Sequence, residues 1–275
     1  MTETTQSKPA PSPVDSALDF VAGVGATLLN FFAATGRLAR FTGVSLYHCV
    51  TPPFFPRLLL RQIIDIGYYS LPVVGMTALF TGMVLALQSY TGFSRFSAEG
   101  AVATVVVLSV TRELAPVLAG LMVAGRIGAS IAAELGTMRV TEQIDALQTL
   151  STNPYKYLVA PRLIAGTFML PVLVLIADII GVMGGYVVGV YKLGFEPGNY
   201  LSKTWQYLVA DDVLSGLYKA AAFGFIVTLM GCYHGYNSKR GAQGVGSAVT
   251  AAVVSGSILI LVTNYFMTQL LFIGK

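Results

Sequence analysis

Apolar residues fill five long segments of this chain, and shorter stretches between them carry most of the charge. The five segments cover roughly residues 63–90, 101–125, 163–191, 213–236 and 245–273. At a rise of about 1.5 Å per residue, a helix of any of these lengths would cross a hydrocarbon core about 30 Å thick. The pattern therefore predicts an all-α polytopic membrane protein with five transmembrane helices.

The chain before the first span has a different pattern. Residues 1–13 are polar and rich in Pro, Ser and Thr, which predicts a disordered tail. Residues 14–50 mix apolar and charged positions, with an acidic start and a basic end, which favours an amphipathic helix in the membrane interface over a sixth span. We expect residues 14–275 to form a single domain.

Composition supports a membrane protein and excludes several other classes. Of the 275 residues, 55% are hydrophobic and only 11% are charged, whereas a soluble domain is nearer a quarter charged. Two cysteines make neither a disulfide framework nor a metal cluster. The chain has no G-x-x-x-x-G-K-[ST] motif, so we expect no cofactor and no ATP bound by a Walker A loop of its own. We also expect no metal site and no nucleic-acid partner.

The distribution of positive charge predicts the orientation of the helices. Of the 17 lysines and arginines, eleven lie before the first span, between the second and third, or between the fourth and fifth. The alternate segments carry four. Because cytoplasmic segments are enriched in Lys and Arg, we expect a cytoplasmic N-terminus and a periplasmic C-terminus.

Two adjacent charges, Arg112 and Glu113, lie in the middle of the second predicted span. Each costs roughly 2.5–3.5 kcal/mol at the centre of a bilayer, so partners or a function must compensate for it. One interpretation is a self-compensating pair that fixes helix packing, although adjacent helical residues point about 100° apart. The other is a role in binding or gating. Lys219 either snorkels outward or joins this site, and for Asp178 we expect a packing role.

A short amphipathic helix is predicted between the second and third spans. Gly136 is expected to end the preceding helix, and Thr141 to N-cap a new one from Glu142 to Leu150. Ile144 and Leu147 share one face, which suits either a protein groove or lipid headgroups. Two acidic residues in the first turn, Glu142 and Asp145, favour the protein groove.

The run RELAPVLAGLMVAGRIGASIAAELGTMRVTEQIDAL, from Arg112 to Leu147, resembles the MlaE/YrbE family of ABC transporter permeases. A weaker likeness extends from about Leu58 to the C-terminus. The resemblance implies a homodimeric permease in the bacterial cell inner membrane that moves phospholipids between the inner and outer membranes. It also implies a cytosolic ABC ATPase subunit that binds the ATP and a periplasmic MCE-domain protein. A small cytosolic STAS-type subunit is an optional further partner.

The resemblance and the polar pattern together indicate two groups of site residues. The lipid cavity or its gate would involve Leu85, Phe93, Phe96, Arg112, Glu113, Lys219 and Asn264. Coupling to the ATPase would involve Glu134, Arg139, Thr141, Glu142, Ile144, Asp145 and Leu147. A phosphodiester headgroup needs a cation, for which Arg112 and Lys219 are the candidates.

Three other functions remain as alternatives. An intramembrane lipid-processing enzyme would also place charges at mid-depth, but it needs a nucleophile or metal ligands, and the sequence has no His or Cys there. A permease for another lipid, such as a sterol, fits the same pattern, because related systems serve such lipids. A passive channel or scaffold would leave the short acidic helix without a role.

Overall fold

The computed structural model describes residues 13–52, 55–96 and 98–272, and helices form nearly all of this part. The predicted tail, apart from Pro13, lies outside the described residues. Contacts divide the chain at residue 44 into two units. Helix α1 (Pro13–Val50) accounts for the described part of the first unit, and its side chains from residue 26 to 37 are exposed. The helix predicted for residues 14–50 is therefore present, and its place at the membrane interface stays a prediction.

Five helical segments of the described chain are long and apolar enough to cross a membrane, which confirms the predicted number of spans. They run over Pro56–Phe93, Val102–Val140, Tyr155–Tyr191, Ala210–Tyr236 and Ala242–Leu271. The first contains α2 (Pro56–Ile66), η1 (Tyr68–Ser70) and α3 (Leu71–Phe93). The short turns η2 (Ser94–Phe96) and η3 (Glu99–Ala101) lead to the second segment.

The second segment alternates between α-helical and π-helical turns. It consists of α4 (Val102–Ser109), η4 (Val110–Leu114), α5 (Ala115–Val123), η5 (Ala124–Gly128) and α6 (Ala129–Val140). Short π-helical turns inside α-helices often occur at functional sites. A helix of 39 residues is about 58 Å long, so this segment must extend beyond a hydrocarbon core about 30 Å thick.

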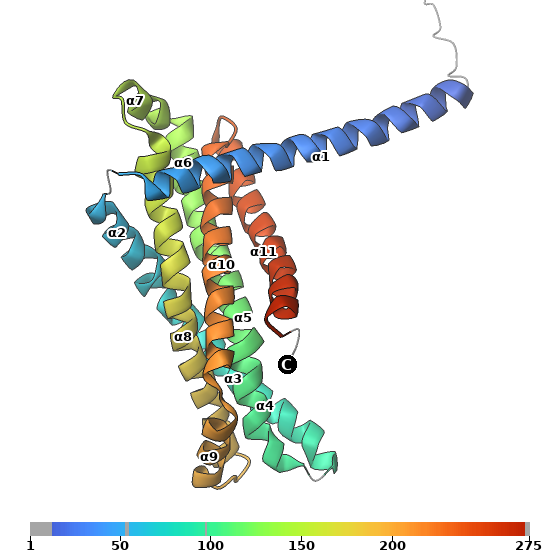
Figure 1. Cartoon of the computed structure of the whole chain (residues 1–275), viewed down its shortest axis with the longest axis vertical. Coiled ribbons are helices and arrows are strands. Elements are labelled where there is room, and N and C mark those ends of the chain that lie inside the picture. The colour runs from blue at the N-terminus through green and yellow to red at the C-terminus, as the bar shows by residue number, and fades with distance from the viewer. Residues whose placement is uncertain (1–12, 53–54, 97, 273–275) are drawn as a thin grey trace, which may run out of the picture. The chain divides into compact units, whose positions relative to one another are not determined.

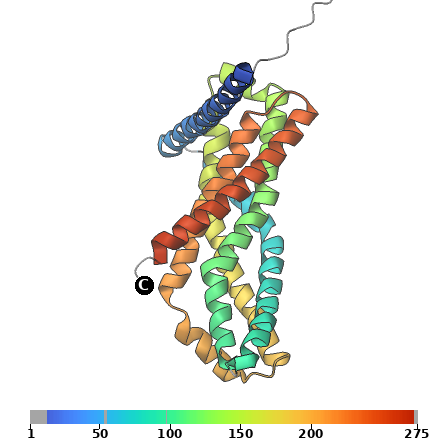
Figure 2. The same ribbon diagram turned by 90° about the vertical axis from the view of Figure 1, so that its right-hand side faces the viewer.

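The remaining helices complete the bundle. The third segment joins η6 (Tyr155–Val159) to α8 (Ala160–Tyr191), and the last two are α10 (Ala210–Tyr236) and α11 (Ala242–Phe272). Helix α8 packs against α3 on one side and α10 on the other, and α11 runs obliquely across α10 and α6 (Figures 1 and 2). Helix α7 (Gln143–Thr149) lies at one end of the bundle and α9 (Pro197–Tyr207) at the other (Figure 1).

Glycines let the central helices approach closely. A Cβ atom placed on Gly82 of α3 would lie 1.9 Å from the carbonyl oxygen of Gly181 in α8. A Cβ on Gly224 of α10 would lie 2.2 Å from the carbonyl oxygen of Gly166, also in α8. Since nothing larger than a hydrogen fits at these crossings, Gly82 and Gly224 lie on the packing faces of their helices.

The expectation that Gly136 ends a helix is wrong, because α6 continues to Val140. A Cβ at Gly136 would lie 3.3 Å from Val245 and 3.4 Å from Ser238 Oγ. The glycine therefore allows α6 to approach the segment around the start of α11 closely, and the helix continues past it.

At the end of the bundle opposite to α7, Tyr200 anchors α9. Its ring packs edge-to-face on Tyr186 of α8 and tilts against Phe195. Only 4% of the residue is exposed, and its hydroxyl has no hydrogen-bond partner among the described residues. Burial raises the pKa of Tyr200 to about 12, because the phenolate would lose its hydration.

Candidate functional site

Arg112 and Glu113 lie in the π-helical turn η4, and each forms an ion pair with a different residue of α10. Arg112 pairs with Asp212, and Glu113 pairs with Lys219. Asp212 and Lys219 are seven residues apart, which is about two helical turns, so both lie on the face of α10 that meets η4. The self-compensating interpretation of the charged pair is therefore wrong. Neighbouring side chains diverge, and each finds its counter-charge on the adjacent helix.

The first pair ties Arg112 to the start of α10. Its Nε and one terminal guanidinium nitrogen lie 2.8 and 2.7 Å from Oδ1 of Asp212. The other carboxylate oxygen of Asp212 accepts a hydrogen bond of 3.3 Å from the backbone N–H of Val209, the N-cap residue of α10. The Asp212 side chain is 4% exposed, whereas that of Arg112 is 37% exposed. Asp212 thus positions the Arg112 side chain, which stays partly exposed.

The second pair is the centre of a larger network. Lys219 Nζ donates to Glu113 Oε1 at 2.7 Å, to Thr268 Oγ1 at 2.7 Å and to the backbone oxygen of Arg112 at 3.0 Å. Asn264 Nδ2 donates to Glu113 Oε2 at 3.0 Å. Three good acceptors around one fully buried ammonium offset much of its desolvation cost. The network therefore joins η4, α10 and α11.

The structure decides between the two interpretations of Lys219. Its side chain is 0% exposed and points to Glu113, so it does not snorkel to the membrane surface. Asn264, one of the residues predicted for the lipid cavity or its gate, lies in the network as well. Asp178 is buried in α8, and neither of its carboxylate oxygens has a hydrogen-bond partner among the described residues.

The sequence analysis assigned neither Asp212 nor Thr268 to the site. A usable signal was present for Asp212. It follows Asp211 at the start of an apolar span and precedes Lys219 by two helical turns, so one face of that helix carries both signs of charge. The second span also carries both signs of charge, and pairing between these two spans compensates all four charges.

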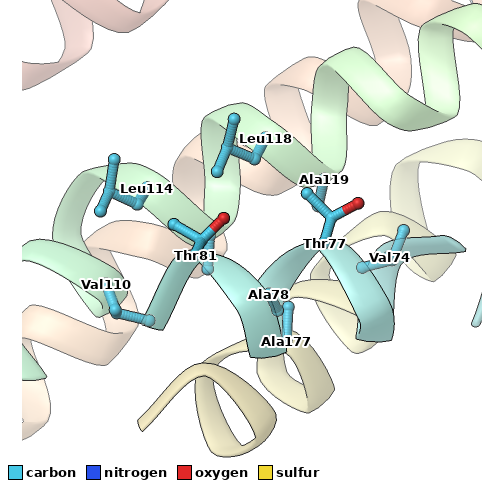
Figure 3. A pocket seen from close by; sticks show the side chains of 10 residues that line it. Val74, Thr77, Ala78, Thr81, Val110, Leu114, Leu118, Ala119 and Ala177 are labelled. Atoms are coloured by element: carbon cyan, nitrogen blue, oxygen red, sulfur yellow. The ribbon is translucent and has the colours of Figure 1, made fainter. Parts of the chain in front are cut away.

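The residues expected to line a lipid path lie on or after α3. Leu85 and Phe93 are half-buried, and the side chain of Phe96 lies outside the described part of the structure. Neither of the two described side chains lines the narrow groove in which Thr77 and Thr81 point from α3 toward the helix carrying Leu114 and Leu118 (Figure 3). Its free volume is about 10 Å³, close to that of a single water probe. An acyl chain does not fit in this conformation.

The predicted coupling residues gather around α7. Arg139 and Asp145 form an ion pair of 2.6 Å, and Glu134 pairs at 2.8 Å with Arg162, a residue of α8 that is almost fully buried. Thr141 donates back to the carbonyl oxygen of Thr137 at 2.9 Å and does not cap α7. The predicted Thr141 cap is therefore wrong. Glu142 holds the N-cap position with φ of 59°, and its left-handed backbone makes the sharp turn into α7.

The apolar face of α7 is divided between the protein interior and the surface. Ile144 is fully buried within this chain, so the expectation that a partner protein buries it is wrong. It holds α7 in place. Leu147 is half-buried, and Leu150, the C-cap residue, is 74% exposed. Any protein that contacts this helix would meet Leu147 and Leu150.

No cluster of three or more His, Cys, Asp or Glu side chains able to hold a metal ion occurs in residues 13–52, 55–96 and 98–272. The polar groups of the η4 site are an Arg, a Lys, two carboxylates, an amide and a hydroxyl. This set of groups suits reversible ion pairing and recognition of an anion. It includes neither an activated nucleophile nor a set of metal ligands.

Comparison with known proteins gives consistent results along most of the chain. Residues 59–270 match the family described as Permease MlaE. A probable ABC transporter permease protein of Rickettsia typhi is 60% identical over 249 residues, which is 90% of this chain and 96% of that protein. The intermembrane phospholipid transport system permease protein MlaE of Haemophilus influenzae is 34% identical over 261 residues, which is 93% of this chain and 98% of that protein. A probable ABC transporter permease protein of Synechocystis is 39% identical over 233 residues, covering 85% and 89% of the two chains.

Proposed function

The chain belongs to the MlaE permease family, and from that premise we propose that it carries phospholipids through the membrane as part of an ABC transporter working between two membranes. Membership makes the chain a permease and not an enzyme, which removes the intramembrane hydrolase from the alternatives. The phospholipid cargo is supported by the Haemophilus relative, which is a permease of an intermembrane phospholipid transport system. It is also supported by the chemistry of the η4 site.

The observation that carries this proposal is the partial exposure of Arg112. Asp212 positions its guanidinium, and the side chain is 37% exposed, so it can contact a phosphodiester with the geometry that arginine favours. Lys219, the other candidate cation, is enclosed by Glu113, Thr268 and the backbone of Arg112. We assign the headgroup contact to Arg112 and a gating role to the Glu113–Lys219 pair.

Gating is needed because the groove beside Leu114 and Leu118 is closed. With a free volume of about 10 Å³ it holds no acyl chain, so α3 and α5 must separate for a lipid to pass. Glu113 links the α5 side of this groove to α10 and α11. If Glu113 exchanged its partners, the second segment, α10 and α11 would switch between two discrete packing arrangements, as packed helices do in other switching proteins.

The remaining parts of the proposal concern the partners. We propose that Leu147 and Leu150 of α7 contact a cytosolic ABC ATPase that binds the ATP, and that a periplasmic MCE-domain protein receives or delivers the lipid. The permease would act as a homodimer in the bacterial inner membrane, with a small STAS-type subunit as a further cytosolic partner. Its N-terminus would be cytoplasmic and its C-terminus periplasmic. A cysteine introduced by Ser202→Cys should then react from the periplasmic side, whereas labelling only from the cytoplasm would reverse this orientation.

The cargo assignment is tested by removing the first ion pair as a unit. Arg112→Gln with Asp212→Asn removes the cation without leaving a buried charge unpaired, and Asp212→Asn alone keeps the cation. In vesicles containing the assembled transporter, we expect the double variant to assemble but to lose transfer of labelled phosphatidylglycerol, while Asp212→Asn retains it. Normal phospholipid transfer by the double variant would refute the headgroup role of Arg112. Transfer of a sterol but not of phospholipid by the wild type would refute the cargo.

A further inference from the structure

A second cavity is formed by the last turn of α1, the start of α2 and the η6–α8 junction. None of its lining residues belongs to the η4 site. Its free volume is about 150 Å³, which matches apolar cavities able to hold a molecule the size of benzene. The walls are mainly apolar and include Cys49, Phe55, Leu59, Ala160 and Ile164. The lining also includes His48 and Lys156, and Lys156 supplies a positive charge. The cavity is thus large enough for several methylene groups and has a lysine ammonium in its wall.

Contacts between distant parts of the chain hold the walls in place. The Cys49 thiol lies 3.9 Å from the carbonyl oxygen of Ala160. The ring of Phe55 packs edge-to-face on Tyr157, with centroids 5.5 Å apart. Lys156 Nζ donates to the carbonyl oxygen of Pro52, which places the ammonium beside the turn between α1 and α2. The cavity is therefore a feature of the packed structure and not a gap beside a loose side chain.

The surroundings of the cavity match the polar boundary of a membrane. On α2, the exposed side chains of Leu60 and Ile64 are one helical turn apart and face outward, as expected for contact with acyl chains. Arg57 and Arg61 are exposed on the same helix, and Asp65 lies 3.9 Å from Arg61. Apolar walls with basic residues at the end of a span form the pattern that binds anionic lipid headgroups.

We propose that this cavity binds one acyl chain of an anionic phospholipid from the surrounding membrane, with the lipid phosphate at Lys156. The bound lipid would be a resident ligand that joins α1, α2 and α8, and not the transported cargo. This site shares no residue with the η4 network or with the groove beside Leu114. Its test does not depend on transport, so failure of this proposal would leave the proposed function untouched.

The two native cysteines allow a direct occupancy measurement. Cys49 lines the cavity and is half-buried, whereas Cys232 is fully buried in α10 and serves as an internal control. Burial raises the pKa of the Cys49 thiol, so alkylation is best followed at about pH 8.5, where more thiolate forms. The rate of N-ethylmaleimide addition is measured by mass spectrometry in a maltoside detergent. The four samples contain no addition, phosphatidylglycerol, phosphatidylcholine or glycerol phosphate.

We expect phosphatidylglycerol to slow alkylation of Cys49 and glycerol phosphate to have no effect. Lys156→Gln should raise the phosphatidylglycerol concentration needed for half-protection about fivefold, the effect of one cation near a lipid headgroup. Lys192→Gln, at the other end of α8, is the matched control and should change nothing. Leu59→Trp should fill the cavity and slow alkylation without added lipid.

Three results would overturn the proposal. Equal alkylation rates in all four samples would show that no lipid enters the cavity. Protection by glycerol phosphate equal to that by phosphatidylglycerol would identify a site for a free anion. Equal half-protection by phosphatidylcholine and phosphatidylglycerol, unchanged in Lys156→Gln, would show that the cation does not select the ligand.

Discussion

Replacing Glu113 with Leu should destabilise the protein much more than replacing Lys219 with Met. Glu113→Leu leaves the ammonium of Lys219 fully buried without the carboxylate of Glu113, while Thr268 and the backbone of Arg112 still accept from it. An uncompensated buried charge of this kind costs roughly 3–5 kcal/mol. Lys219→Met leaves a Glu113 side chain that is 38% exposed and keeps its hydrogen bonds from Asn264 and Thr268. We expect that change to cost about 1–3 kcal/mol.

The double variant separates pairing from packing. With Glu113→Leu and Lys219→Met together, an apolar pair replaces the ion pair, and such exchanges are often neutral or stabilising. Its free energy of unfolding should therefore lie within about 1 kcal/mol of the wild-type value. This loss is much smaller than the sum of the losses in the two single variants. The gating role predicts in addition that this stable variant assembles but does not transport lipid.

The assay is a titration of SDS into detergent-solubilised protein, followed by circular dichroism, for the wild type, both single variants and the double variant. Asp145→Leu is the control. It breaks the exposed ion pair with Arg139 and should cost less than about 1 kcal/mol. Additive single effects, or a Lys219→Met variant less stable than Glu113→Leu, would refute the reasoning that Glu113 is what compensates Lys219.

Three further predictions follow from other parts of the molecule. Leu150→Glu should prevent co-purification of the ATPase while leaving the membrane helices folded, since Leu150 is 74% exposed at the end of α7. Gly224→Ala should lower the free energy of unfolding by about 1–3 kcal/mol, because its Cβ would lie 2.2 Å from a backbone oxygen of α8. Stability should fall as the pH rises from about 10 to 12, since Tyr200 ionises near 10 when unfolded but near 12 when folded, and Tyr200→Phe should flatten this dependence.

Each of these has a contradicting outcome. Full retention of the ATPase by Leu150→Glu would place the docking surface elsewhere. Gly92→Ala, where a Cβ meets nothing within 4 Å, is the control for Gly224→Ala, and equal effects of the two changes would exclude close approach as the cause. A pH dependence that is the same in Tyr200→Phe and the wild type would assign the titration to another group.

The five spans could be read from the sequence because they depend on short-range order. A stretch of about 20 apolar residues must form a helix in lipid, where every backbone polar group needs a partner within its own segment. The charges of Arg112 and Glu113 marked a costly position in the same way, since the cost depends on depth in the membrane and not on the partner.

The partners of those charges were decided by tertiary structure. Asp212 and Lys219 are 100 and 106 residues from Arg112 and Glu113, and Asn264 is 151 residues from Glu113. Such pairings depend on which helices are neighbours and on how each is rotated about its axis, neither of which a single helical pattern contains. The self-compensating interpretation failed for this reason.

Local signals misled where a distant segment changed their meaning. Gly136 has the sequence of a helix stop, but it packs closely against the start of α11, and the helix continues through it. Ile144 has the pattern of an exposed docking residue, but the turn at Glu142 directs it into this chain's own core. The sequence determined which segments are helical and where charge is costly. The tertiary structure decided which polar groups meet and which apolar ones stay exposed, because burial depends on the whole set of neighbouring helices.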